Sequence, residues 1–290
     1  MRTFDYASFE TIPTPGEVKL YLSLIKEYKG KLQDIYVRKP DTLNKMIHFA
    51  AQRSAGASNR MEGIATTDKR LPDLLDGEIR PESIAEKEIL GYKYCMDLIR
   101  KNQDSFTFTP ADILQLHEHL YRYNPSRESG HFKNDDILDE QMREECGIPE
   151  NDRAPCTKTI HFVPSSALDT PLAMQNLCDA YNRAMEKNAV SSLVLSFQFV
   201  LDFLCISPFH EGNGRMSRLL MHLLLYQNDY KAGKCISLEE MMERTRSSYC
   251  EALRQSTENW QEGTNNPWPF ICYMLGIILS AYRELENRFV

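Results

Sequence analysis

The side chains best suited to chemistry in this chain of 290 residues lie in one short stretch, residues 207–218, with the sequence SPFHEGNGRMSR. An apolar, helix-like run over residues 194–206 stops at Pro208, and a second apolar helix follows the Gly-Asn-Gly turn. Backbone N–H groups at a helix N-terminus, together with guanidinium groups, favour a bound anion. The arrangement therefore predicts a phosphate-binding turn.

The residue types in this turn fit that interpretation. Glu211 offers hard carboxylate oxygens, which suit Mg²⁺ held against a phosphate. Glycine has no Cβ to keep a phosphate from the backbone, asparagine tolerates left-handed conformations, and arginine is a planar donor that stays charged. We expect Phe209 to anchor the loop in the core. The alternative to a phosphate-binding turn is a helix–turn–helix corner with solvated arginines. The residues expected to bind the phosphate are Gly212, Asn213, Gly214, Arg215 and Arg218.

A second pattern lies far upstream, where Ser58 and Glu62 are four residues apart and Gly63 follows. This spacing places both side chains on one face of a helix. Taken alone, the pattern also fits a helix C-terminus with a surface glutamate.

The elements that must position these residues are mostly helices. Asp41 can N-cap a helix that Gly63 ends, Ser83 and Glu86 form a capping-box pattern, and Thr109 precedes a proline at a helix start. We predict an all-α fold with an N-terminal helical region over residues 1–100 and a core domain over 101–290. The expected helices cover residues 18–36, 42–62, 84–101, 110 onward, 170–187, 190–206, 213–228, 237–256 and 267–288.

Residues 124–164 interrupt this helical pattern and are rich in Asp, Glu, Gly and Pro. The β-branched alternation over residues 157–164 predicts a short hairpin at the end of the segment. Such a long irregular insertion in a helical protein is usually functional or disordered.

The composition of the chain argues against a nucleic-acid-binding protein and against a membrane protein. The net charge of −7 and the absence of a basic tract argue against nucleic-acid binding. No apolar run approaches the roughly 20 residues that span a bilayer, so we expect no membrane insertion. The eight cysteines are scattered, without metal-ligand spacing, which favours free thiols in a cytoplasmic protein.

Residues 207–218 resemble the Fic-domain motif, His-Pro-Phe-x-(Asp/Glu)-Gly-Asn-Gly-Arg-x-x-Arg. They match eight of its nine fixed positions and depart at Ser207, where the motif has histidine. The resemblance extends over about residues 40–288 and includes Gly130–Lys133 and Ile236–Glu239. It implies a Fic-type helical bundle with a small β-hairpin flap. It also implies transfer of AMP from ATP, with Mg²⁺, to a Ser, Thr or Tyr hydroxyl of a target protein; a second copy of the chain is a further expected partner.

The resemblance assigns roles to other residues. Ser58, Glu62 and Gly63 are similar to the inhibitory motif (Ser/Thr)-x-x-x-Glu-(Gly/Asn), whose glutamate pairs with the second motif arginine, here Arg218, in place of the γ-phosphate. The predicted hairpin is similar to the family's flap, which docks a target segment by strand addition; a plain surface hairpin is the alternative. The flap positions are Thr159, Ile160 and His161, and Tyr249 with Cys250 marks an adenine pocket.

Ser207 stands where the family has its general base. A serine hydroxyl cannot usefully accept the proton of the attacking hydroxyl at pH 7, and losing a positioned base typically costs about 10²–10⁴ in rate. Three explanations stay open: a natural pseudo-enzyme that binds nucleotide for regulation, a chain whose histidine has been replaced, or another base such as His210 or His161. Nucleotide binding is expected in each case. The competing function classes are an impaired adenylyltransferase, or another phosphoryl or nucleotidyl transferase, and a non-catalytic nucleotide-binding module.

Overall fold

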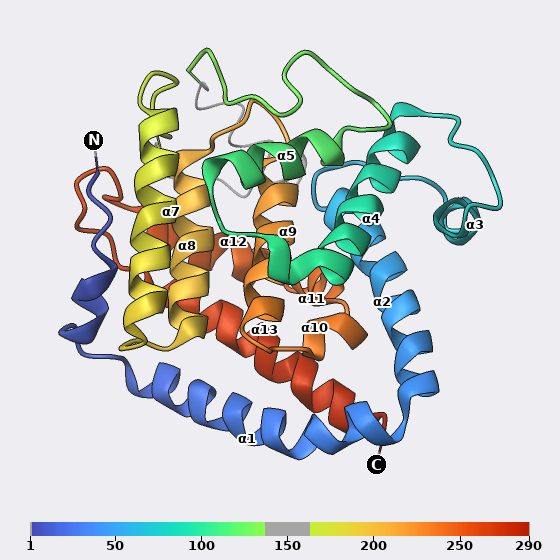
Figure 1. The fold of residues 1–290 in the computed structure, drawn as a ribbon, viewed down its shortest axis with the longest axis horizontal. Coiled ribbons are helices and arrows are strands. Elements are labelled where there is room, and N and C mark those ends of the chain that lie inside the picture. Colours follow the sequence, from blue (N-terminus) through green and yellow to red (C-terminus); the bar gives the residue numbers. More distant parts are fainter. Residues whose placement is uncertain (1, 137–162, 290) are drawn as a thin grey trace.

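The computed structural model describes residues 2–136 and 163–289, and within these ranges all regular elements are helical (Figure 1). The predicted all-α class is confirmed. The predicted flap residues Thr159, Ile160 and His161 lie outside the described residues. The elements are η1 (Tyr6–Glu10), α1 (Gly16–Arg38), α2 (Pro40–Arg60), α3 (Arg70–Asp76), α4 (Ile84–Asn102), η2 (Gln103–Ser105), α5 (Pro110–Leu120), α7 (Thr170–Lys187), α8 (Ser192–Ile206), α9 (Asn213–Gln227), α10 (Ala232–Cys235), α11 (Leu238–Arg244), α12 (Arg246–Thr257) and α13 (Trp268–Asn287).

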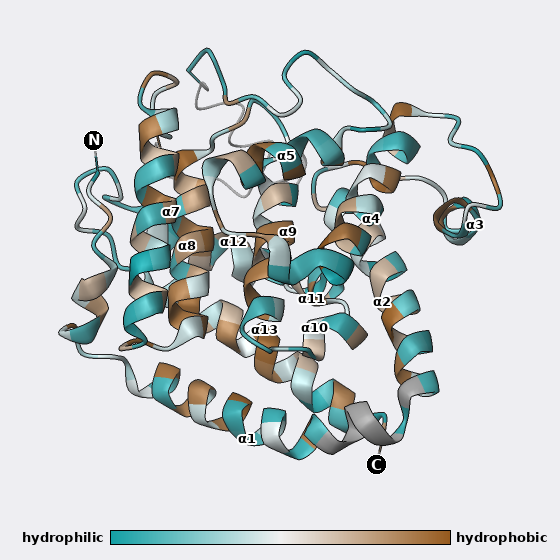
Figure 2. Cartoon of the chain, in the orientation of Figure 1, coloured by the Kyte–Doolittle hydropathy of each residue, from teal (hydrophilic) through white to brown (hydrophobic). Residues whose placement is uncertain are grey.

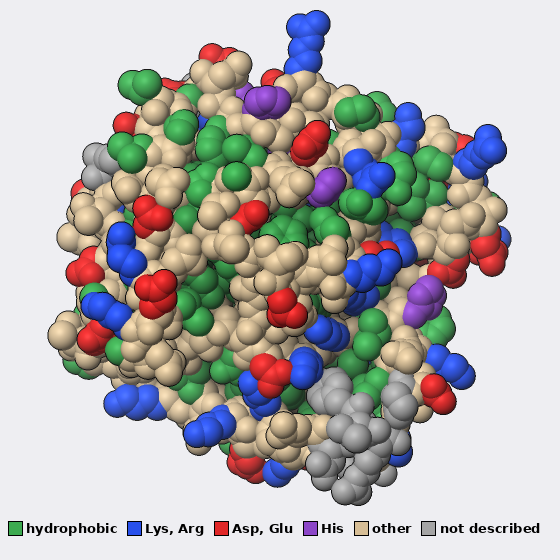
Figure 3. All heavy atoms as spheres, in the orientation of Figure 1, with side chains coloured by type: hydrophobic (Ala, Val, Ile, Leu, Met, Phe, Trp, Pro, Cys, Tyr) green, Lys and Arg blue, Asp and Glu red, His purple; other side chains and the backbone are tan. Residues whose placement is uncertain are grey.

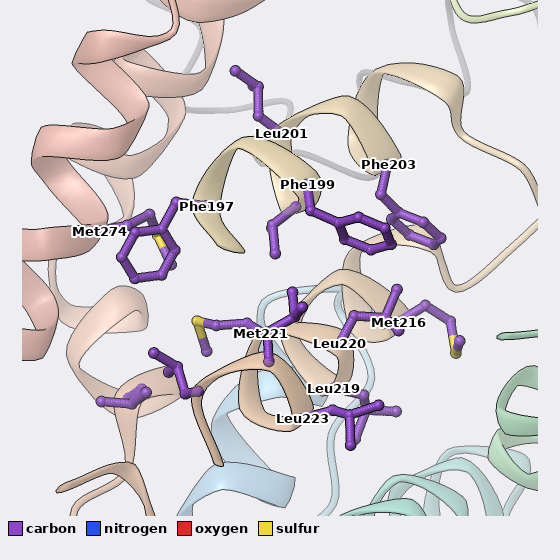
Figure 4. Close-up of a cluster of buried hydrophobic side chains, with 14 of the residues drawn as sticks. Phe197, Phe199, Leu201, Phe203, Met216, Leu219, Leu220, Met221, Leu223 and Met274 are labelled. Carbon is purple, nitrogen blue, oxygen red and sulfur yellow. The ribbon is translucent and has the colours of Figure 1, made fainter. Parts of the chain in front are cut away.

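The centre of the molecule is the antiparallel pair α8 and α9, which carries the predicted phosphate turn at its connection. Apolar residues are concentrated on these two helices (Figure 2). Phe199 and Phe203 of α8 lie above Met216 and Leu220 of α9, and all four side chains are buried (Figure 4). Burial of this much apolar surface fixes the two helices against each other, and with them the turn.

The N-terminal helices are packed onto this centre. In Figure 1, α1 runs beneath α13, and its residues Val18 and Ile25 are fully buried there. Helix α2 packs against α4, α10 and α11. The C-terminal end of α2 also contacts the N-terminal part of α9, where Arg218 binds Ser58.

Several predicted helix boundaries were wrong, and two of the differences have a local cause. Helix α2 begins at Pro40, so Lys39 is its N-cap and Asp41 lies in the first turn, because proline's fixed φ favours the first helical position. The helix expected over residues 237–256 is divided into α11 and α12 at Thr245. The Thr245 hydroxyl donates to the Met241 carbonyl at 2.9 Å, and such back-bonding bends a helix.

Other expectations were confirmed. Helix α7 has the predicted bounds, and Thr109 opens α5 with a capping box to Asp112. At α4 only half of the predicted box forms: Ser83 caps the Glu86 N–H, whereas the Glu86 carboxylate accepts hydrogen bonds from the Glu82 N–H and from Arg70. Those hydrogen bonds lower the pKa of Glu86 to about 2.

The surface shown in Figure 3 mixes basic and acidic side chains over the whole face. Among the described helices, none has a segment both long and apolar enough to cross a membrane. The cysteines within residues 2–136 and 163–289 are free thiols.

Candidate functional site

Ser207 closes α8 in a left-handed conformation, with φ 45°. Its N–H donates to the Phe203 carbonyl at 3.0 Å, and its hydroxyl donates to the Leu204 carbonyl at 2.9 Å. Left-handed caps satisfy the last carbonyls of a helix, and here the serine side chain satisfies one more. The hydroxyl is therefore used by the helix end.

The turn itself is braced by Asn213. The Asn213 side chain accepts from the Phe209 N–H at 3.0 Å and donates to the Phe209 carbonyl at 2.8 Å. Asn213 is the first residue of α9, and Gly212 takes the left-handed position of the turn, with φ 79°. Phe209 is fully buried, as predicted.

His117 of α5 holds the turn from the other side and was not identified from the sequence. Its ring stacks on Phe209, with the centroids 3.7 Å apart and an interplanar angle of 2°. Its Nδ1 accepts from the Gly130 N–H at 3.0 Å, so Nε2 carries the proton and donates to the Glu211 carbonyl at 3.2 Å. Burial lowers the pKa of His117 to about 4, which keeps this imidazole neutral at pH 7.

Lys133 belongs to the segment Gly130–Lys133 that resembles the family, and it ties that segment to the turn. Its N–H donates to the Pro208 carbonyl at 2.9 Å, and its buried ammonium donates to the Ile206 carbonyl at 3.1 Å. The two carbonyls flank Ser207, so Lys133 fixes the backbone on both sides of that residue.

The two motif arginines have different surroundings. The Arg215 guanidinium, 3% exposed, donates to the Glu88 carboxylate at 2.6 Å and to the Tyr121 hydroxyl at 2.9 Å. Glu88 belongs to α4, and Tyr121 is the C-cap residue of α5. In this state Arg215 holds α9 against both helices, and its predicted phosphate contact stays a prediction.

Arg218 meets the second sequence pattern, as the resemblance implied. Its Nε donates to the Ser58 hydroxyl at 2.7 Å, and its Nη2 donates to the Ser58 carbonyl at 2.9 Å and to Glu62 Oε1 at 2.5 Å. A Cβ added at Gly214 would lie only 2.4 Å from Glu62 Oε1. The Glu62 carboxylate therefore fills the space in front of the N-terminus of α9, where an anion is favoured.

The end of α2 is anchored on the core around this contact. Arg60 forms a two-pronged pair with Glu243 of α11, both distances being 2.7 Å, and Arg246 donates to the Met61 carbonyl at 2.7 Å. The helix ends at Arg60, two residues earlier than predicted, so Glu62 lies in the closing turn. Gly63 takes the left-handed conformation with φ 75°, which fits its predicted role in ending the helix.

Glu211, the predicted Mg²⁺ ligand, is exposed beside the turn. In the part of the chain that the structure describes, no group of three or more His, Cys, Asp or Glu side chains could hold a metal ion. Mg²⁺ is usually held by one or two carboxylates together with substrate phosphates, and a lone carboxylate beside a phosphate turn fits that mode.

The remaining predicted residues lie farther out. His210 Nε2 is 2.7 Å from the side-chain oxygen of Asn134, so its ring is engaged with the residue that follows the Gly130–Lys133 segment. The buried Tyr249 ring packs against Phe270 and Tyr273, while Cys250 is partly buried. Two aromatic rings that were not identified from the sequence thus pack on Tyr249, and the adenine pocket at Tyr249 and Cys250 stays a prediction.

A model described as the Fic/DOC family matches residues 107–225. Among solved structures, a Fic family protein from Desulfovibrio desulfuricans superposes with a TM-score of 0.73 at 20% identity, covering 96% of this chain and 76% of the other. A Fic domain containing signaling protein from Bacteroides thetaiotaomicron gives 0.70 at 20% identity, with 92% and 95% covered. Fic-1 (residues 134–508) from C. elegans gives 0.71 at 13% identity, with 98% and 73% covered.

Proposed function

Residues 107–225 form a domain of the Fic/DOC family, and from this premise we propose that the chain is an adenylyltransferase of the Fic type, autoinhibited by Glu62 and impaired in turnover at Ser207. Fic proteins generally transfer a nucleoside monophosphate to proteins. The observation that carries the proposal is the Glu62 carboxylate on Arg218 at the N-terminus of α9. It takes the place of an anion in a site built for one.

In the proposed reaction, the hydroxyl oxygen of a target Ser, Thr or Tyr attacks the α-phosphorus of ATP. A bond from that oxygen to phosphorus forms, the bond to the β-phosphate oxygen breaks, and pyrophosphate leaves. Arg218, once free of Glu62, would hold phosphate oxygens, and the N–H groups of α9 would stabilise the charge that develops there. Glu211 would hold Mg²⁺, which neutralises phosphate charge.

The proton of the attacking hydroxyl needs an acceptor. Ser207 donates its own hydroxyl to the Leu204 carbonyl, and a serine is not a useful base at neutral pH. His210 is engaged with Asn134. Binding and turnover are therefore separable in this chain, and the occupied Ser207 hydroxyl favours a second candidate function, a nucleotide-binding regulatory module without catalysis.

Incubation with labelled ATP and Mg²⁺ tests the proposal in four chains: the unaltered protein, Glu62→Gly, Ser207→His and the double variant. We expect the double variant to incorporate the most label, into itself or an added protein extract. ATP binding without incorporation in all four chains would favour the regulatory module. Absence of ATP binding in the Glu62→Gly chain would refute the phosphate-site assignment itself.

A further inference from the structure

Beneath the contact between Glu62 and Arg218 lies a set of fully buried polar side chains that the proposed reaction does not use. It consists of Ser58 of α2, Tyr92 of α4, His222 of α9 and Glu239 of α11, and we call it the Tyr92–Glu239 network. Each residue comes from a different helix. Because unpaired polar groups are costly to bury, the pairing within the network must help to determine how these helices dock.

The hydrogen bonds of the network run in one direction. Arg218 Nε donates to the Ser58 hydroxyl oxygen, so the Ser58 hydroxyl proton needs another acceptor, and the Tyr92 phenol oxygen supplies it. Tyr92 in turn donates to Glu239 Oε1 at 2.7 Å, and His222 Nε2 approaches the same oxygen at 2.8 Å. An ionised carboxylate can only accept, so it fixes the direction of every bond that precedes it.

Glu239 remains ionised at any ordinary pH. Burial alone would raise its pKa, but the charge and hydrogen bond of His222, with hydrogen bonds from Ser54 and Tyr92, lower the pKa of Glu239 to about 2. The Tyr92 hydroxyl is consequently committed to donating, and its oxygen remains available to Ser58.

Helix α2 contributes Ser58 to this network, and Ser54 of the same helix is also fully buried and hydrogen-bonds Glu239. We propose that Tyr92, through Ser58, and Glu239, through Ser54, are positioning residues that hold the end of α2 in its docked state, and thereby set how often Glu62 leaves Arg218. This inference rests on the proposed function, because it concerns access of nucleotide to the same site. If α2 undocks, water can satisfy Ser58, so loss of the Tyr92 hydroxyl penalises the docked state more than the undocked one.

The substitution Tyr92→Phe tests this role, with Tyr6→Phe as the matched control. Tyr6 is also buried and donates to a buried carboxylate, that of Asp202 at 2.9 Å, but its helix η1 packs against α7, and Asp202 lies on α8. The quantity measured is the affinity for ATP with Mg²⁺, by calorimetry. If Tyr92 only stabilised the fold, its loss would not increase this affinity.

We expect Tyr92→Phe to tighten ATP binding about tenfold when Glu62 is present, because apparent affinity is proportional to the fraction of open molecules. In the Glu62→Gly background, Tyr92→Phe should change the ATP affinity less than twofold. Tyr6→Phe should leave the ATP affinity unchanged both with Glu62 present and in the Glu62→Gly background. Amide hydrogen exchange should also be faster over residues 51–62 in Tyr92→Phe than in Tyr6→Phe.

Unchanged ATP affinity and unchanged exchange in Tyr92→Phe would overturn the inference, as would equal weakening of ATP binding in both backgrounds. If ATP fails to bind even to the Glu62→Gly chain, the proposed function fails, while the exchange measurement still decides whether Tyr92 holds α2. Should Tyr92→Phe not fold, Glu239→Gln provides the second variant with the same expected direction.

Discussion

Glu62 and Arg218 lie 156 positions apart in the sequence and meet at 2.5 Å at the N-terminus of α9. Two further hydrogen bonds of Arg218 go to Ser58, through its hydroxyl and its carbonyl. The two residues have different roles: Ser58 orients the Arg218 guanidinium, whereas the Glu62 carboxylate fills the space in front of it. Removing Glu62 should therefore open the site without disordering Arg218.

The first prediction concerns Glu62 directly. Glu62→Gly should bind ATP at least tenfold more tightly than the unaltered chain, because the competing carboxylate is gone while Ser58 still holds Arg218. Glu62→Gln is the matched control, since its amide fills the same space without the charge, and it should give an intermediate affinity. Calorimetric titration with ATP and Mg²⁺ measures both. Equal affinities in all three chains would contradict the blocking role.

A second prediction uses the close approach at Gly214. Gly214→Ala should destabilise the chain by about 1–3 kcal/mol, because the added Cβ would lie 2.4 Å from Glu62 Oε1 and force it aside. In the Glu62→Gly background the same change should cost less, since only the approach to Arg218 Nη1 at 3.3 Å remains and alanine is the better helix former. Urea unfolding of the unaltered chain, the two single variants and the double variant gives the coupling free energy between positions 62 and 214. Additive effects would show that Glu62 does not occupy this space.

The pKa of His117 gives a third prediction, a pH dependence of stability. Its folded pKa of about 4 lies below the unfolded value of about 6.5, so the unfolded chain binds the extra proton between these values. The stability that comes from the neutral ring is complete above pH 6.5 and is lost as the pH falls towards 4, by up to about 3 kcal/mol.

Urea unfolding at pH 7 and pH 5 checks this slope. In His117→Gln the free energy of unfolding should be lower at pH 7 but should fall less between pH 7 and pH 5. An unchanged slope in His117→Gln would show that this ring is not the source.

A fourth prediction concerns the pair that anchors α2 to α11. Glu243→Gln weakens the two-pronged contact with Arg60, so Glu62 should leave Arg218 more often and ATP binding should tighten a few fold. Glu251→Gln disrupts a similar pair with Arg254 within α12 and is the matched control. A tightening of equal size in both variants would indicate a general charge effect instead of release of α2.

Local patterns explain why much of the site could be predicted. The turn between α8 and α9 was readable because glycine, acid and arginines follow one another within a few positions. Ser58 and Glu62 were readable because helical spacing puts them on one face. The break at Thr245 was missed, since periodic apolar residues continue through it and the bend depends on a hydroxyl bonding back to Met241.

By itself, the sequence determined most of the long helices, the turn at residues 207–218 that we predict to bind phosphate, and the pairing of Glu62 with Arg218. Only the tertiary structure decided the partners of each charge. Glu88, 127 positions from Arg215, binds it, and His117 stacks on Phe209 while both of its ring nitrogens are used. Helical periodicity shows which face of a helix is buried but not which neighbour it meets. Those contacts depend on how the helices pack, and that packing minimises the exposed apolar surface of the whole chain.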